Sequence, residues 1–144
     1  MKQISDLLNH KGRDIWSLTP DTSVYDAIEQ MAHRGVGALL VMEDGQLVGI
    51  VSERDYARKV ILKGKASRET TVREIMSSPV VCCRPELTVE ETMTVMTEKR
   101  VRHLPVMVGE KVVGVISIGD VLRGMMDDRE FHIQQLTKYI TGGA

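Results

Sequence analysis

The segments VGIVSERDYAR (residues 48–58) and VGVISIGDVLR (residues 113–123) share the pattern V-G-x-x-S-x-x-D-x-x-R. An ungapped comparison of residues 20–58 with residues 85–123 finds 12 identical positions among 39. Unrelated segments of this length would agree at only a few positions, so the chain contains an internal duplication. The two copies are therefore expected to be the same folding unit.

Each copy predicts a β-hairpin preceded by one more short strand. The hairpin strands are expected over residues 38–42 and 46–52 and over residues 104–108 and 111–117, and the preceding strands over residues 14–18 and 80–83. Asp44-Gly45 marks a tight turn in the first hairpin, because glycine adopts positive φ at little cost. Gly109-Glu110 occupies the same place in the second hairpin.

Helices are predicted on both sides of each hairpin, which makes the repeat β-α-β-β-α. Apolar residues spaced three and four apart predict the first helix of each copy: Val24, Ala27, Ile28 and Met31, and less regularly Val89, Met93 and Met96. Ser23 and Thr88 precede these helices as candidate N-caps. The closing helices are expected to begin near Glu53 and Ile118.

The repeat predicts an α/β (α+β) fold in which two copies pack about a pseudo-twofold axis. One copy of about 50 residues would be marginally stable alone, since its sheet keeps one face bare. Pairing the copies buries both faces. The expected organisation is an N-terminal segment with repeat 1 (1–62), a linker (63–70), repeat 2 (71–127) and a C-terminal helix and tail (128–144).

The composition is that of an ordinary folded domain. Hydrophobic residues make up 42% of the 144 residues and charged residues 27%, which is too apolar for disorder. The net charge of −1 argues against nucleic-acid binding. The sequence has no apolar run long enough for a membrane span and no secretory signal, so it predicts a cytoplasmic protein. The adjacent Cys82 and Cys83 are expected to be small hydrophobic strand residues.

The two S-x-x-D elements allow two interpretations. A serine followed by an acid three residues later is a capping box, which would make Ser52/Asp55 and Ser117/Asp120 structural. Capping boxes prefer Glu or Gln, however, and both copies carry the shorter Asp where a buried strand gives way to a helix. There an Asp could accept both hydroxyls of a ribose, and the serine hydroxyl and nearby amides could face a phosphate.

The spaced pair GIVSERD and GVISIGD resembles a pair of CBS domains, the unit called a Bateman module, over about residues 11–127. The resemblance implies a stand-alone regulatory protein that binds a nucleotide in clefts built from both repeats. The Asp of the motif would hold the ribose and the serine would lie near phosphate. The first cleft would comprise Asp120, Ser117, Gly119, Val115, His103, Arg102, Lys11, Trp16, Val36 and Gly37. The second would comprise Asp55, Ser52, Arg54, Ile50, Met76, Val81 and Val101.

The two clefts are expected to differ in charge. Arg54 would lie beside phosphate in the second cleft, although an arginine in an exposed turn can equally be a solvated charge. The positive charge of the first cleft is expected from the segment KRVRH (residues 99–103). His103 could instead bond a backbone carbonyl, and Trp16 could be a core residue. Different affinities or different nucleotides are therefore predicted.

The expected ligand is an adenine nucleotide, first AMP, with ADP, ATP, NAD or S-adenosylmethionine as alternatives. No catalytic triad, metal cluster or phosphate loop is recognisable, so a sensor that signals to an unidentified protein partner is favoured over an enzyme. The alternative is an interaction or dimerisation scaffold with vestigial clefts. Apolar residues of the tail (Phe131, Ile133, Leu136, Tyr139, Ile140) and ISDLL (residues 4–8) either pack on their own domain or support an expected homodimer.

Overall fold

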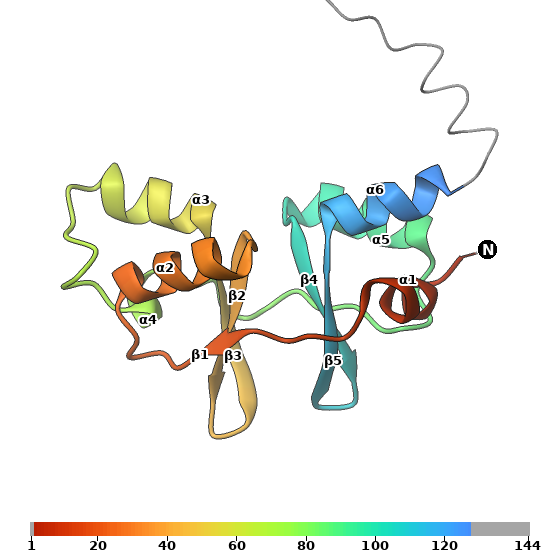
Figure 1. The fold of residues 1–144 in the computed structure, drawn as a ribbon, viewed down its shortest axis with the longest axis horizontal. Helices are drawn as coiled ribbons and strands as arrows, with labels where there is room; N and C mark the ends of the chain where they lie inside the picture. Colours follow the sequence, from red (N-terminus) through yellow and green to blue (C-terminus); the bar gives the residue numbers. More distant parts are fainter. Residues whose placement is uncertain (1, 128–144) are drawn as a thin grey trace, which may run out of the picture.

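The computed structural model describes residues 2–127, in which two β-hairpins lie side by side with helices at their outer sides (Figure 1). The predicted apolar stripe of the tail lies outside the described residues. The first repeat comprises β1 (Ser17–Leu18), α2 (Val24–Arg34), β2 (Ala38–Glu43), β3 (Gln46–Ser52) and α3 (Glu53–Tyr56), which continues as the π-helical stretch η1 (Ala57–Ile61). The second repeat comprises α5 (Val89–Lys99), β4 (His103–Val108), β5 (Lys111–Ser117) and α6 (Ile118–Met126). A short helix precedes each repeat: α1 (Ile4–Lys11) and α4 (Val72–Ile75).

The predicted β-α-β-β-α order is confirmed in the first repeat. Its sheet has the order β1-β2-β3, with β1 parallel to β2 and β2 antiparallel to β3. Asp44 (φ 52°) and Gly45 (φ 78°) both have positive φ in the hairpin turn, as the sequence predicted. In the second hairpin Gly109 (φ 61°) takes the left-handed conformation.

Residues 80–83 were predicted to form the first strand of the second repeat, and this prediction is wrong. Only one parallel bridge forms there, between Cys83 and Val106, and the sheet has two strands, β4 and β5. In the first repeat the Leu40 amide donates to the Trp16 carbonyl at 3.2 Å. Pro105 occupies the position of Leu40 in the duplication and has no N–H, so this ladder bond cannot form.

The predicted helix caps are confirmed. The Ser23 hydroxyl accepts from the Asp26 amide and the Thr88 hydroxyl from the Glu91 amide, each at 3.1 Å. The core positions Val24, Ala27, Met31, Val89 and Met96 are buried, whereas Ile28 and Met93 are only partly buried. In α5 it is Thr92, rather than the neighbouring Met93, that is fully buried. Its hydroxyl donates to the Thr88 carbonyl at 2.8 Å, so it needs no other partner.

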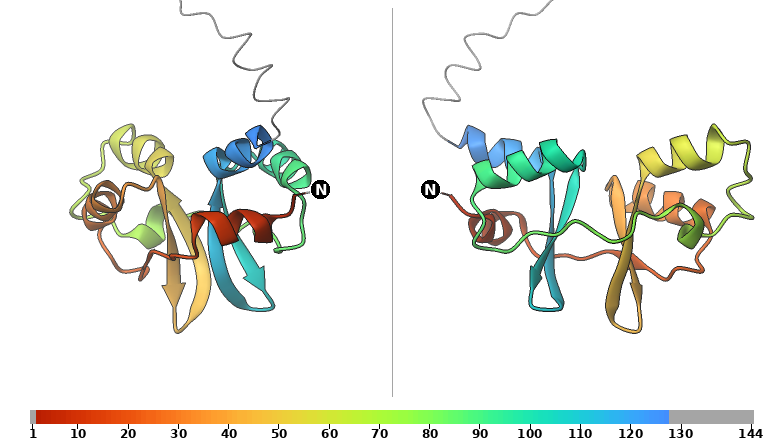
Figure 2. Two further views of the ribbon diagram at one scale, coloured as in Figure 1. Left: turned by 45° about the vertical axis from the view of Figure 1, so that its right-hand side comes forward. Right: turned by 180° about the vertical axis from the view of Figure 1, so that it is seen from behind.

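The short helices α1 and α4 are exchanged between the repeats (Figures 1 and 2). Helix α1 precedes the first repeat but packs on the second, where Ile4, Leu7 and Leu8 join the core of β4, β5 and α6. Helix α4 correspondingly packs on the first repeat through Val72 and Ile75. The apolar residues of ISDLL are therefore buried in their own chain and are not available for a dimer contact.

This exchange ties the two repeats into one pseudo-symmetric unit. The segment after α1 crosses from the second repeat to β1, and the segment after α4 crosses in the opposite direction to Cys83 (Figure 2). The two crossing segments run on opposite sides of the pair of hairpins (Figure 2), and each contributes residues to one of the clefts described below. None of the helices within residues 2–127 is long and apolar enough to cross a membrane.

Candidate functional site

Two cavities lie between the repeats, and their linings are related by the same duplication as the sequence. The first cleft has a volume of about 370 Å³ and contains Ser117 and Asp120. The second has a volume of about 410 Å³ and contains Ser52 and Asp55. Each cleft combines the serine and acid of one repeat with the start of the hairpin of the other repeat. The crossing segment completes the wall.

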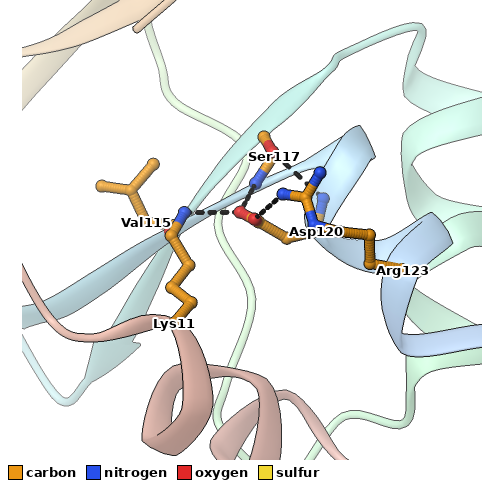
Figure 3. Close-up of polar contacts among 5 residues, drawn as sticks. All are labelled: Lys11, Val115, Ser117, Asp120 and Arg123. Carbon is orange, nitrogen blue, oxygen red and sulfur yellow. Dashed lines mark hydrogen bonds and ion pairs between the residues drawn. The ribbon is translucent and has the colours of Figure 1, made fainter. Parts of the chain in front are cut away.

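In the first cleft, Asp120 at the start of α6 is the centre of a polar cluster (Figure 3). Its Oδ2 accepts from the Ser117 amide at 2.8 Å and also from Lys11 Nζ. Its Oδ1 accepts from Arg123 Nη2 at 2.7 Å. Lys11 Nζ also donates to the Val115 carbonyl at 2.8 Å. The last residue of α1, a helix that packs on the second repeat, thus bonds the acid of that repeat in the lining of the cleft.

Asp120 is ionised at neutral pH although it is only 7% exposed. Burial opposes its ionisation, but the hydrogen bonds from Lys11 and the Ser117 amide and the charge of Lys11 outweigh that effect and lower its pKa. Burial, followed by the charge of Lys11, lowers the pKa of the neighbouring His103. Near neutral pH the first cleft therefore presents a carboxylate beside an uncharged imidazole.

The second cleft repeats the cap but surrounds it differently. Asp55 Oδ2 accepts from the Ser52 amide at 2.9 Å and from the Ser52 hydroxyl at 3.1 Å. Asp55 Oδ1 lies 3.2 Å from Lys59 Nζ. The position of Lys11 is taken by Met76 in the duplication, so the end of α4 supplies no lysine to Asp55. Both capping boxes exist, and in each the acid also faces a cavity.

Most of the residues assigned to the clefts from the sequence lie in the linings. The first cleft brings together Asp120, Ser117, Val115, Lys11, Trp16, Val36, Gly37 and His103. The second brings together Asp55, Ser52, Arg54, Ile50, Val81 and Val101. Gly119 and Met76 line neither of these clefts. Gly119 lies beneath the Arg123 guanidinium, and the Met76 side chain packs against Gly49.

The placement of Arg102 in the first cleft is wrong. Arg102 lines the second cleft together with Arg100. The reason is the pseudo-twofold relation: residues 35–38 precede the first hairpin and line the first cleft, so residues 100–103 must line the second. His103 alone of the segment KRVRH also reaches the first cleft. The predicted source of positive charge therefore belongs largely to the other cleft.

Several lining residues were not singled out from the sequence. Arg123 and Arg58 end the repeated pattern S-x-x-D-x-x-R, and a residue three positions after the acid lies on the same helical face. That shared arginine was the signal that could have identified them. Lys59 lies four positions after Asp55, which is a similar signal. Gly12, Asp14 and Ser77 have no comparable signal, because they lie on the crossing segments. Arg100 was expected to contribute charge to the first cleft but lines the second.

The cysteines were expected to be small hydrophobic strand residues, but Cys82 is half-buried and lies in no strand, and Cys83 forms only an isolated bridge. Cys83 is buried in the core of the second repeat, and burial together with Cys82 raises its pKa to about 12. Burial also raises the pKa of Cys82. Within residues 2–127 no group of three or more His, Cys, Asp or Glu side chains could hold a metal ion.

Comparisons with known proteins identify the family. The CBS domain family model matches residues 4–62 and 72–127. The mitochondrial CBS domain-containing protein CBSX3 of Arabidopsis thaliana is 40% identical, over 97% of this chain and 72% of that protein. A putative signal-transduction protein with CBS domains from Burkholderia ambifaria is 41% identical with a TM-score of 0.86, over 99% of this chain and all of that chain.

A more distant structure shares the fold. The CBS domain pair of protein MJ0100, in complex with 5′-methylthioadenosine and S-adenosyl-L-methionine, has a TM-score of 0.78 at 22% identity. The alignment covers 88% of this chain and 98% of that one. The family model matches two segments of the chain, as the duplication in the sequence requires. The relative that is 40% identical belongs to the same family. The chain belongs to the CBS domain family, as a tandem pair of CBS repeats.

Proposed function

We propose that this CBS pair is a regulatory module that binds adenine nucleotides, AMP among them, between its repeats and signals through their relative arrangement to a protein partner. The observation that carries the proposal is Asp120, an ionised and almost fully buried carboxylate in the wall of a cavity of about 370 Å³. Small-molecule sites are typically of this size, with mainly apolar walls and a few convergent polar groups.

The residues around the first cleft suit the three parts of a nucleotide. Ribose hydroxyls would donate to Asp120, at the place that Lys11 Nζ holds in the structure. Lys11 would then be released toward the phosphate, where a flexible ammonium is a good partner. Val36, Ile50 and Val115 offer an apolar wall for the base. One face of the Trp16 ring carries the Arg34 guanidinium at 4.0 Å from the ring centroid, so only the remainder of the ring is available.

The MJ0100 pair is in complex with two adenosyl ligands, which supports adenosine as the recognised group here. Conversion of binding into a signal requires a ligand that prefers one arrangement of the repeats over another. Because each cleft contains residues of both repeats, a bound ligand touches both at once. This arrangement supports a regulatory role.

Isothermal titration calorimetry of the full chain with AMP, ADP, ATP, NAD and S-adenosylmethionine tests the proposal. We expect micromolar or tighter binding of at least one of them, with Asp120→Ala losing binding in the first cleft and Asp55→Ala in the second. The matched control is Glu91→Ala, which removes the acid of another capping box, at α5, away from both clefts. No heat with any ligand, or equal losses in Glu91→Ala, would refute it.

The alternative of an interaction scaffold is favoured by one observation. Both acids already have full sets of partners, since Asp120 bonds Lys11, Arg123 and Ser117 and Asp55 bonds Ser52 and Lys59. In a scaffold, the two Asp variants would lose stability without altering any ligand response. The homodimer and the cytoplasmic location stay predictions. Native mass spectrometry would report the oligomer and any retained nucleotide together.

A further inference from the structure

The two clefts differ sharply in the charge of their linings. The second cleft contains five cationic side chains, Arg54, Arg58, Lys59, Arg100 and Arg102, against two acids, Glu53 and Asp55. The first contains Lys11 and Arg123 against Asp14 and Asp120, so its charges cancel. His103 lines both clefts and adds little charge to either near neutral pH, because its pKa is lowered.

The cations of the two clefts also differ in availability. Lys11 and Arg123 of the first cleft are both engaged by Asp120. In the second cleft only Lys59 has such a partner, Asp55. Among residues 2–127 no acid lies within ion-pair distance of the four arginines of the second cleft. These four guanidinium groups outnumber the two acids of the lining, Glu53 and Asp55, and neither acid lies within ion-pair distance of them.

The backbone conformation of Arg100 is a second feature of this cleft. Arg100 follows α5 in the left-handed conformation (φ 56°, ψ 42°), a position where helices usually place glycine. The equivalent residue in the first repeat is Gly35, also left-handed (φ 67°, ψ 35°). A side chain at such a position strains the backbone, and strain of this kind is concentrated at functional sites. The strained residue here is an arginine that lines the cationic cleft.

We propose that the clefts sort adenine ligands by phosphate charge. The second cleft takes a nucleotide with two or three phosphates, and the first takes an adenosyl ligand with one phosphate or none. The inference rests on the proposed function and adds the ligand class of each cleft. One guanidinium group can donate two parallel hydrogen bonds to a phosphate. Several arginines without an acidic partner therefore suit a chain of two or three phosphates better than a single phosphate.

The first cleft suits the smaller ligand for the complementary reason. A ribose that takes Asp120 frees Lys11 and leaves Arg123 in place, which is enough positive charge for one phosphate. Asp14 in the same lining would repel a second and third phosphate. A ligand with a positive charge and no phosphate would meet the two acids of the first cleft, whereas the second cleft would repel it.

The test is calorimetry of the full chain with AMP and ATP, using Arg100→Gly. Glycine is the residue of the equivalent position and relieves the backbone, so this variant should melt about 2–4 °C above the wild type. We expect its affinity for ATP to fall about fivefold, the contribution of one exposed charge pair. Its affinity for AMP in the first cleft should stay within twofold of the wild type.

Lys99→Ala is the matched control, because it removes the neighbouring positive charge from α5 without touching either lining. Its ATP affinity should remain that of the wild type. Asp55→Ala should abolish the tighter ATP site, and Asp120→Ala should leave that site intact. Two outcomes would overturn the assignment of ligands to clefts without affecting the proposed function. One is ATP binding that is lost in Asp120→Ala and kept in Asp55→Ala. The other is equal ATP affinity in Arg100→Gly and the wild type. No binding of any adenine ligand would overturn the proposed function as well.

Discussion

Gly114→Ala should destabilise the protein, because helix α1 lies directly against this glycine in β5. A Cβ atom at Gly114 would lie 2.6 Å from Leu8 Cδ2, 3.1 Å from Leu8 Cδ1 and 3.4 Å from Leu8 Cγ. Leu8 is fully buried, so rotation of its side chain cannot move all three atoms away. The added methyl group must therefore push α1 away from the second repeat.

The expected loss is about 1–2 kcal/mol. Overpacking of a filled core costs about 1–3 kcal/mol. Replacing glycine in a strand recovers about 0.5–1 kcal/mol, because alanine loses less backbone entropy on folding. For a chain of this size the net change corresponds to a melting temperature lowered by about 2–8 °C. Because Lys11 is the last residue of α1, the same shift should weaken ligand binding in the first cleft more than in the second.

Urea unfolding followed by circular dichroism measures the change, with Gly119→Ala as the control. Gly119 lies in the first turn of α6, and the nearest atom to its Cβ would be Arg123 Nη1 at 3.4 Å, the end of a flexible, mostly exposed side chain. Alanine should raise stability there by up to about 1 kcal/mol. If both variants were as stable as the wild type or more so, α1 would not occupy the position described.

Two further predictions concern titratable groups. The lowered pKa of Asp120 stabilises the folded protein above the unfolded pKa of about 3.9, and this contribution is lost as the pH falls through the lower folded value. Lys11→Met, which copies Met76 of the other repeat, should therefore lose less unfolding free energy than the wild type between pH 6 and about pH 3; an equal loss would contradict the role of Lys11. With a pKa of about 12, Cys83 should resist iodoacetamide at about pH 8 until the protein unfolds. Mass spectrometry measures the labelling. If Cys83 in the folded protein reacted as fast as a free thiol, its burial and raised pKa would be contradicted.

The duplication predicted most of the fold because most local signals recur in both copies. Caps at Ser23 and Thr88, the turn at Asp44-Gly45 and the apolar periodicity of α2 are each local, and all lie where the sequence placed them. The one failed strand was also a local effect. Pro105 stands opposite the segment 80–83 and cannot donate the amide that Leu40 donates in the first repeat. Comparison of the copies at that position would have predicted the shorter sheet.

The exchange of α1 and α4 could not be predicted from local signals. Each helix packs against the core of one repeat through contacts between residues far apart in the sequence, which leave no local signal. Leu8 meets Gly114, and Met76, just after α4, meets Gly49. The assignment of Arg102 to the first cleft failed for a related reason. The resemblance placed Arg102 in the first cleft and its neighbour Val101 in the second, whereas the structure places both in the second.

The two clefts are not independent, because one wall serves both. Gly37, Ala38, Ile50 and His103 line the first cleft and the second. Two of its residues are in contact across the repeats: the His103 Cε1 atom lies 3.5 Å from the Cβ position of Gly37. Within the proposed function, a ligand that displaces His103 from one side changes the shape and charge offered to a ligand on the other side. Any such coupling must be reciprocal, so AMP should shift the affinity for ATP by the same factor as ATP shifts that for AMP. Replacing His103 with alanine, the residue at the equivalent position 38, should reduce that factor toward one.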